Sequence, residues 1–208
     1  MRYDFIWFDL GYTLLHTKRE KQFRAVLAHF DIDRSEEDIG RSFHLVDKLF
    51  MREYPGVLGK PAENFMPWYM GFVCHNLDVE GDILRICVRW MDAWTSVSPL
   101  WHAYDVAGPA LSRLTELGVG LGVISNWDAS AKPILRECGL LDYFDPCIIS
   151  SEVGVSKPSE AIFRLALAES GIDPSRCLYV GDHYYDDVVG AAKVGMDAVI
   201  VNRYGSFG

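Results

Sequence analysis

The sequence has no hydrophobic run long enough to cross a membrane. A membrane-spanning helix needs about 20 consecutive apolar residues, and the uncharged stretches here stay well short of that length. The first residues are interrupted by Asp4 and Asp9 and contain no small-residue cleavage site. We therefore expect a protein with no membrane partner and no secretory signal peptide.

Paired cysteine motifs are also missing. The five cysteines show no CxxC spacing and lie mostly inside apolar segments, at positions 74, 87, 138, 147 and 177. Scattered cysteines are typical of reduced core residues, whereas zinc sites and disulfide frameworks use recognisable spacings. This pattern predicts free thiols and a cytoplasmic location.

Positive charge is scarce. The chain has 20 Lys and Arg against 29 Asp and Glu, which gives a formal net charge of −9. Nucleic-acid-binding proteins usually carry a basic surface, so we expect no nucleic-acid partner. An acidic protein that binds an anion must concentrate its cations locally, which makes single well-placed lysines of interest.

What the sequence does contain is an alternation of two kinds of segment. Its 208 residues, half of them hydrophobic, suffice for one domain or for one domain with a smaller insertion. Short runs rich in Val, Ile and Phe predict strands at 3–9, 119–126, 146–150, 176–182 and 197–202. Helix-like segments lie at 106–118, 128–139, 159–171 and 186–195. This alternation predicts an α/β fold with a doubly wound parallel sheet.

Residues 16–98 break the alternation. Their pattern predicts helices at 18–30, 35–54, 62–77 and 81–94. Ser35 and Asp38 fit a capping box at the start of the second helix. We interpret residues 16–98 as an inserted α-helical cap domain and residues 1–15 and 99–208 as the α/β core. Aromatic residues at helical spacing are expected mainly in the cap interior: Phe65, Trp68, Tyr69, Phe72, Trp90 and Trp94.

Polar residues stand at the ends of the predicted strands. Asp9 directly follows the apolar run Phe5–Phe8, where a carboxylate without a partner would be costly. The later strands lead into Ser125, Asn126, Lys157 and Asp182. Because ligands of doubly wound sheets bind beyond the carboxyl ends of the strands, we expect these side chains to converge on one site.

This arrangement resembles the haloacid dehalogenase-like hydrolase superfamily, most of whose members are magnesium-dependent phosphatases. The matching segments are DLGYT at 9–13, VISN at 123–126, KP at 157–158 with IF at 162–163, and VGDHYYDD at 180–187 followed by GAAKVGM. Their order and spacing agree over essentially the whole chain. The helical block also lies where the family inserts a helical cap of the C1 type.

The resemblance implies phosphate hydrolysis through an aspartyl phosphate. Asp9 would be the nucleophile, and Lys157 would neutralise charge on Asp9 and on the transferring phosphoryl group. Ser125 and Asn126, together with Lys157, would bind that group. A capped crevice favours a small phosphorylated metabolite over a macromolecular substrate. The oligomeric state, monomer or homodimer, stays open.

The resemblance also implies a Mg²⁺ site. Asp9 and Asp182 would be ligands, and the backbone carbonyl of Gly11 would be a further one. Asp187 would support the metal from behind its direct ligands or through water, with Asp186 as its substitute. Hard oxygen ligands suit Mg²⁺, and a cation lets an anionic carboxylate approach an anionic phosphate.

Most of these residues also have an ordinary structural explanation. A serine at a strand end often caps a turn or helix, and lysine is mostly solvated. Asp186 and Asp187 would be favourable in the first turn of a helix. Asp9 fits such an explanation least, because its flanks are apolar. The joint occurrence of all of them favours the functional interpretation.

The sequence departs from the family at residue 11. The usual pattern has a second aspartate there, which serves as general acid and then as general base, but this chain has Gly11. Tyr12 stands where the pattern often has glycine. Loss of a general acid and base typically costs about 10²–10⁴-fold in rate. Tyr12, His16 and His183 are candidate replacements, although a lone histidine is more often structural.

Three interpretations follow from this departure. The favoured one is a phosphatase whose substrates have good leaving groups, such as acyl or anomeric phosphates. The second is an L-2-haloacid dehalogenase, whose tyrosine would occupy position 11 rather than 12 and which needs no acidic metal site. The third is a catalytically weak relative that binds a phosphorylated ligand or a protein partner.

Overall fold

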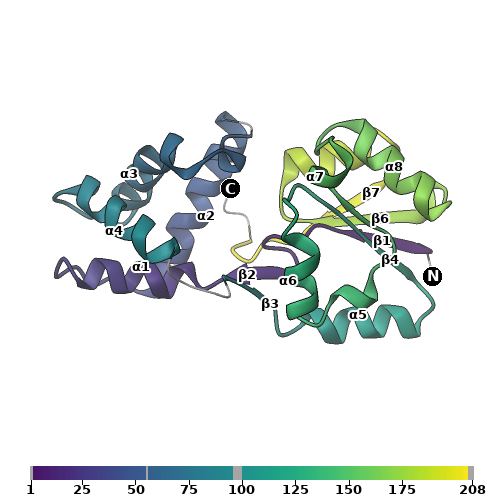
Figure 1. Ribbon diagram of the computed structural model, residues 1–208, viewed down its shortest axis with the longest axis horizontal. Coiled ribbons are helices and arrows are strands. Elements are labelled where there is room, and N and C mark those ends of the chain that lie inside the picture. Colours follow the sequence, from purple (N-terminus) through teal and green to yellow (C-terminus); the bar gives the residue numbers. More distant parts are fainter. Residues whose placement is uncertain (1, 55, 96–99, 206–208) are drawn as a thin grey trace. The chain divides into compact units, whose positions relative to one another are not determined.

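The computed structural model describes residues 2–54, 56–95 and 100–205 (Figure 1). The chain forms two compact units, one made of Met1–His16 and Trp101–Asn202, the other of Thr17–Leu100 and Arg203–Gly208. The predicted boundary between residues 98 and 99 lies outside the described residues. None of the described helices is both long enough and apolar enough to span a membrane.

The first unit is built on a five-stranded sheet in the order β5-β4-β1-β6-β7, and every neighbouring pair is parallel. The strands are β1 (Phe5–Phe8), β4 (Gly120–Ser125), β5 (Cys147–Ile149), β6 (Cys177–Gly181) and β7 (Asp197–Ile200). β1 is central, and Phe5 pairs with both Gly120 and Cys177. All five strands lie within their predicted ranges.

The central strand is buried on both faces, as its unbroken apolar sequence requires. Phe5 and Trp7 belong to one hydrophobic core cluster, and Ile6 and Phe8 belong to another. A Cβ on Gly122 would overlap the ring of Trp7, so glycine lets this indole lie against β4. The two clusters give the sheet a packed layer on each side.

Helices cover both faces of this sheet (Figure 1). α5 (Ala107–Glu116) and α6 (Ala131–Glu137) contribute to the cluster that holds Ile6. α8 (Glu160–Ser170) and α9 (Gly190–Ala192) contribute to the cluster that holds Phe5. α7 (Ser150–Val153) is a single turn after β5, and a π-helix (Tyr184–Val189) precedes α9. The predicted doubly wound α/β class is confirmed.

A second, two-stranded sheet was not predicted. It pairs β2 (Leu15–Thr17) with β3 (Trp101–Ala103). Each strand has only three residues, which is too short for an alternating pattern to be recognised. The two segments are far apart in the sequence, so their pairing depends on the rest of the fold bringing them together.

The second unit is helical. Its main elements are α1 (Arg19–Ala28), α2 (Glu36–Glu53), α3 (Met66–Asn76) and α4 (Ile83–Thr95), with short 3₁₀ turns at Val57–Gly59 and Ala62–Asn64. Ser35 caps α2: its Oγ accepts a hydrogen bond from the Asp38 amide at 3.0 Å. The Ser35 hydroxyl in turn donates to the Asp38 carboxylate at 2.6 Å, so the serine half of the predicted capping box is confirmed.

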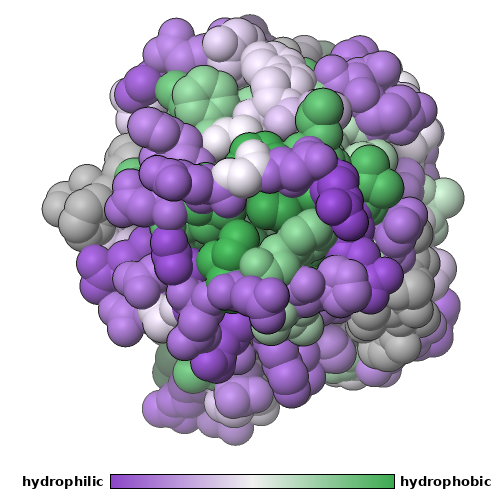
Figure 2. All heavy atoms as spheres, turned by 90° about the vertical axis from the view of Figure 1, so that its left-hand side faces the viewer, coloured by the Kyte–Doolittle hydropathy of each residue, from purple (hydrophilic) through white to green (hydrophobic). Residues whose placement is uncertain are grey.

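The aromatic residues expected inside this helical unit are mostly there. Phe65, Tyr69 and Trp90 are buried in its core, and Trp68 and Trp94 pack against it. Phe72 differs, because 38% of it is exposed. Figure 2 shows a face of the unit on which apolar side chains gather in a hollow surrounded by hydrophilic ones.

Candidate active site

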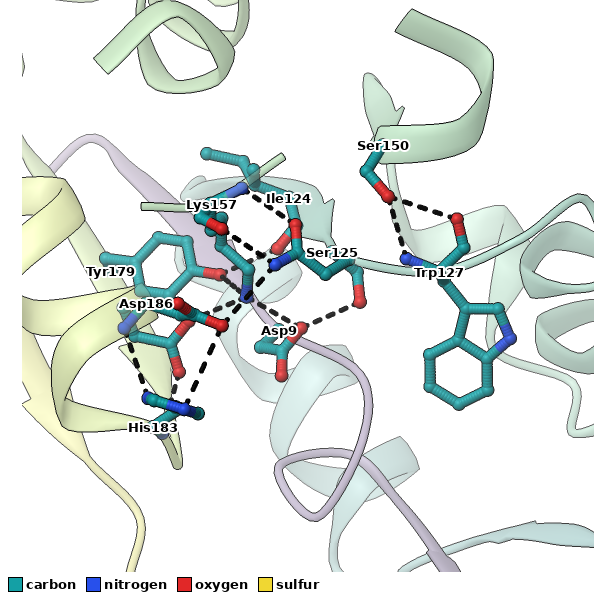
Figure 3. Close-up of polar contacts among 11 residues, drawn as sticks. Asp9, Ile124, Ser125, Trp127, Ser150, Lys157, Tyr179, His183 and Asp186 are labelled. Carbon is teal, nitrogen blue, oxygen red and sulfur yellow. Dashed lines mark hydrogen bonds and ion pairs between the residues drawn. The ribbon is translucent and has the colours of Figure 1, made fainter. Parts of the chain in front are cut away.

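The polar residues predicted from the sequence lie at the carboxyl ends of the parallel strands. Asp9 directly follows β1, and Ser125 ends β4. Asp182 directly follows β6. Lys157 reaches the same place from the loop before α8, and Asp187 reaches it from the π-helix. Figure 3 shows several of these side chains turned toward one another.

Asp9 is held by hydrogen bonds to one of its two carboxylate oxygens. The Ser125 hydroxyl donates to Asp9 Oδ1 at 2.7 Å, and Lys157 Nζ lies 3.0 Å from the same oxygen (Figure 3). Among the described residues, Oδ2 is the oxygen left for a substrate or a metal. With 9% of the residue exposed, this carboxylate is fixed but reachable.

The Lys157 ammonium group has three close oxygen neighbours. Besides Asp9 Oδ1, its Nζ lies 2.6 Å from Asp187 Oδ1 and donates to the Tyr179 hydroxyl at 2.9 Å. Its side chain is 2% exposed. The ordinary explanation of Lys157 as a solvated surface lysine is therefore wrong. It is a buried cation between two carboxylates.

Tyr179 is a site residue that sequence reasoning missed. Its hydroxyl accepts the hydrogen bond from Lys157 and donates to the Ile124 carbonyl at 2.7 Å (Figure 3). The residue is fully buried in β6. The available signal was a tyrosine inside a buried strand, because a buried phenol needs a polar partner. Tyr179 thus positions the Lys157 ammonium.

Replacing Tyr179 by Phe should destabilise the fold by about 1–3 kcal/mol, because it leaves a buried carbonyl and a buried N–H without their partner. The matched control is Tyr3→Phe, which removes a tyrosine hydrogen bond to Asp197 at an exposed position. Urea unfolding of both variants measures the difference. Equal costs would mean that the buried hydroxyl contributes no more than the exposed one.

Asn126 joins β4 to the loop that carries Lys157. Its Oδ1 accepts from the Lys157 amide at 2.8 Å, and its Nδ2 donates to the Lys157 carbonyl at 3.0 Å. The same Nδ2 lies 3.4 Å from Asp186 Oδ2. These contacts bind the amide to the protein backbone, so Asn126 fixes the position from which Lys157 enters the site.

The pKa values of both Asp9 and Lys157 are raised, but by different causes. Burial raises the pKa of Asp9, and Asp187 adds to the rise, while Lys157 and Ser125 oppose it. Burial alone would lower the pKa of Lys157, but Asp187 and Asp9 outweigh it and raise that pKa well above the usual value. Lys157 is therefore a permanent cation at neutral pH.

Three carboxylates of the site could hold a metal ion together. Asp9, Asp182 and Asp187 each offer one oxygen, and these oxygens lie within 4.8 Å of one another. Such a set of hard oxygen donors fits a cation like Mg²⁺. Gly11 lies two residues after Asp9, in the turn between β1 and β2.

The π-helix places two adjacent aspartates, Asp186 and Asp187, in different environments. Asp187 is fully buried, and its Oδ2 accepts a hydrogen bond from the His183 amide at 2.9 Å. A Cβ on Gly181 would overlap this carboxylate, so glycine is needed where β6 ends. Asp186 is outside the group of three carboxylates, and its amide donates to His183 Nδ1 at 3.1 Å. His183 thus caps the π-helix.

The chain is similar to known proteins over most of its length. The family model of haloacid dehalogenase-like hydrolases matches residues 3–195. The chain is 40% identical to the pyrimidine 5'-nucleotidase YjjG of Escherichia coli, over 98% of this chain and 88% of that protein. It is also 40% identical to a glyceraldehyde 3-phosphate phosphatase of Pyrococcus abyssi, over 93% of this chain and 79% of that one.

Other similarities are partial or concern the fold alone. The chain spans less than half of the haloacid dehalogenase-like hydrolase domain-containing protein 3 of Danio rerio, with 37% identity over 50% of this chain and 43% of that protein. A HAD phosphatase from Thermococcus onnurineus has a TM-score of 0.58 at 24% identity, over 99% of this chain and 89% of that one. A 2-haloacid dehalogenase from Pseudomonas syringae has a TM-score of 0.55 at 24% identity, over 98% of this chain and 88% of that one. The chain belongs to the haloacid dehalogenase-like hydrolases.

Proposed function

We propose that this chain is a Mg²⁺-dependent phosphatase that hydrolyses a small phosphorylated metabolite through an aspartyl phosphate. The observation that carries the proposal is the Asp9 carboxylate, which Ser125 and Lys157 hold by Oδ1 beside the carboxylates of Asp182 and Asp187. The nucleotidase and phosphatase named among the relatives support a phosphorylated substrate for this chain as well.

In the first step Asp9 Oδ2 forms a bond to phosphorus, and the bond from phosphorus to the leaving-group oxygen breaks. The leaving group departs with the electron pair of that bond. Ser125 and Lys157 hold the attacking carboxylate by its other oxygen, and Lys157 also neutralises negative charge. Mg²⁺ held by Asp9, Asp182, Asp187 and the Gly11 carbonyl would supply the charge that lets phosphate approach.

In the second step a water oxygen forms a bond to phosphorus, and the bond from phosphorus to Asp9 breaks. Inorganic phosphate leaves, the water loses one proton to solvent, and Asp9 is a carboxylate again. Asn126 and Tyr179 keep Lys157 in place during both steps through its backbone and its ammonium group.

We further propose that the enzyme acts in the cytoplasm and does not bind nucleic acid. All five cysteines are free, and burial raises the pKa of Cys74, Cys147 and Cys177 to about 11, so their thiols are poorly reactive. The net charge of −9 disfavours a polyanionic partner. Residues 16–98 would be the cap domain, and residues 1–15 and 99–208 the core.

The proposal is tested by phosphate release from acetyl phosphate, glucose 1-phosphate and alkyl phosphates, with Mg²⁺ or with EDTA. Release that falls to background with EDTA and returns with added Mg²⁺ is the expected result, because the carboxylates around Asp9 need a cation before phosphate can approach. Chloride release from 2-chloropropionate, measured in parallel and indifferent to EDTA, would identify a dehalogenase instead. Inactivity in both assays would favour a binding role.

Replacing Gly11 by Asp should raise kcat/KM for alkyl phosphates by at least about 10-fold, because it adds a proton donor for a poor leaving group. A Cβ at residue 11 would lie 3.5 Å from the nearest ring atom of Trp127, an ordinary van der Waals contact, so the first atom of the new side chain meets no clash. Gly11→Asn is the control, because it has the same shape without the acid. An equal rise in both variants would contradict the acid–base explanation.

A further inference from the structure

Aromatic rings lie beside Gly11. A Cβ on this residue would lie 3.5 Å from Cζ3 of Trp127 and 3.7 Å from Cη2 of Trp101. This is the position from which the second aspartate of the usual family pattern would project. In this chain it faces two indole edges instead of carrying a carboxylate.

The two indoles are held in place by their own contacts. Their ring centroids lie 4.7 Å apart with an interplanar angle of 59°. Trp127 Nε1 donates to Ser130 Oγ at 3.0 Å. The Trp127 amide donates to Ser150 Oγ at 3.1 Å (Figure 3). Trp101 lies in β3. Both tryptophans are half-buried, so they present a fixed and partly accessible aromatic surface.

Tyr12 extends this surface at the cost of backbone strain. Its φ is 54°, a left-handed conformation that glycine adopts easily and that bulky residues rarely adopt. The hydrogen bond from the Tyr12 amide to the Leu15 carbonyl, at 2.7 Å, belongs to this turn. The Tyr12 ring meets Trp101 edge-on, with centroids 5.7 Å apart. An aromatic residue therefore occupies a turn position that suits glycine better.

Two chemical consequences follow for the proposed phosphatase reaction. With glycine at residue 11, no carboxylic acid at that position can protonate the departing oxygen, which favours a leaving group that is stable as an anion. The two half-buried indoles beside Gly11 offer aromatic surface, which favours flat, apolar rings. A carboxylate or phenolate that carries an aromatic ring meets both conditions, whereas an alkoxide meets neither.

Resting on the proposed function, we propose that the substrate is an aromatic phosphate, an aroyl or aryl phosphate whose ring lies against Trp101 and Trp127. Asp9 Oδ2 forms a bond to phosphorus while the bond from phosphorus to the bridging oxygen breaks. The aromatic carboxylate or phenolate keeps the electron pair and departs without taking a proton. Trp101 and Trp127 are then the residues that determine specificity for the leaving group.

The test compares kcat/KM for benzoyl phosphate and acetyl phosphate. These substrates release carboxylates of similar acidity and differ in the ring, so their ratio reports recognition of the ring alone. The wild-type ratio is expected to favour benzoyl phosphate by about 10-fold. In Trp127→Leu and Trp101→Leu the ratio should fall to about one, whereas Trp127→Phe, which keeps a ring, should retain most of it.

The outcomes separate this inference from the proposed function. Hydrolysis of acetyl phosphate with a wild-type ratio near one would overturn the aromatic substrate and leave the phosphatase standing. A high ratio that survives in both leucine variants would overturn the assignment to the indoles. A merely structural role of the tryptophans would lower both activities by the same factor. Inactivity on both substrates would overturn the phosphatase and this inference together. If the leucine variants do not fold, the ratio of kcat/KM values of the wild-type protein still tests whether an aromatic substrate is preferred.

Discussion

Replacing Asp9 by Asn should lower phosphate release by at least about 10⁴-fold while leaving the protein folded. The amide keeps the shape of the carboxylate and an oxygen that can accept the Ser125 hydrogen bond, but it is a poor nucleophile. Burial raises the pKa of Asp9, so removing its charge should not destabilise the unit. Phosphate release and circular dichroism of the variant are the measurements.

The matched control for Asp9 is Asp4→Asn, at the opposite end of the same strand. Asp4 precedes β1 and pairs with Arg176 at the surface. Its replacement removes one carboxylate of equal size without touching the site, and activity should stay within about twofold, because exposed ion pairs contribute little. Turnover in Asp9→Asn equal to that of Asp4→Asn would exclude an aspartyl phosphate on Asp9.

Replacing Lys157 by Met should destabilise the protein by about 3–5 kcal/mol and abolish activity. Methionine fills a similar volume, but it leaves Asp9 and Asp187 as two buried carboxylates without their shared cation. The Tyr179 hydroxyl also loses its donor. Urea or guanidinium unfolding monitored by tryptophan fluorescence gives the free energy of unfolding of the variant.

The control for Lys157 is Lys132→Met, because Lys132 pairs with Glu152 at 2.7 Å in solvent, with side chains 39% and 40% exposed. Its loss should cost no more than about 1 kcal/mol. The raised pKa of Lys157 means that its stabilisation is complete below the ordinary lysine value of 10.5 and is lost only as pH rises through the higher folded value. The difference in free energy of unfolding between Lys157→Met and Lys132→Met should therefore persist from pH 6 to pH 9. Its disappearance within that range would contradict the role of Lys157 as a buried, permanently charged partner of Asp9 and Asp187.

The sheet could be predicted from the sequence because its strands are buried on both faces. β1 shows this most clearly: its apolar run from Phe5 to Phe8 has no solvent-facing position, and Asp9 marks its end. The strand ends in turn predicted which polar residues would meet. β2 and β3 gave no such signal, because the pairing of two three-residue segments depends on the fold around them.

Inside the site, contacts that depend on side-chain geometry could not be predicted. The sequence favoured Asp187 over its neighbour Asp186 only by resemblance, whereas the π-helix buries the one and leaves the other partly exposed. Tyr179 belongs to the site because its hydroxyl lies between Lys157 and Ile124. The proximity of Trp101 and Trp127 to Gly11 likewise arises only where β3 and the loop after β4 meet the first turn.

The central position of β1 has a consequence for how the chain folds. Residues 5–8 of β1 pair with residues 120–123 of β4 on one side and with residues 177–180 of β6 on the other. Both partner strands are therefore synthesised long after β1. Contacts between such distant segments form slowly, because a long loop must close first. The core of the helical unit, in contrast, draws on one continuous stretch from Phe23 to Trp90. During synthesis we expect the helices to order first, while β1, which Asp9 follows, waits for β6 and the site is completed last.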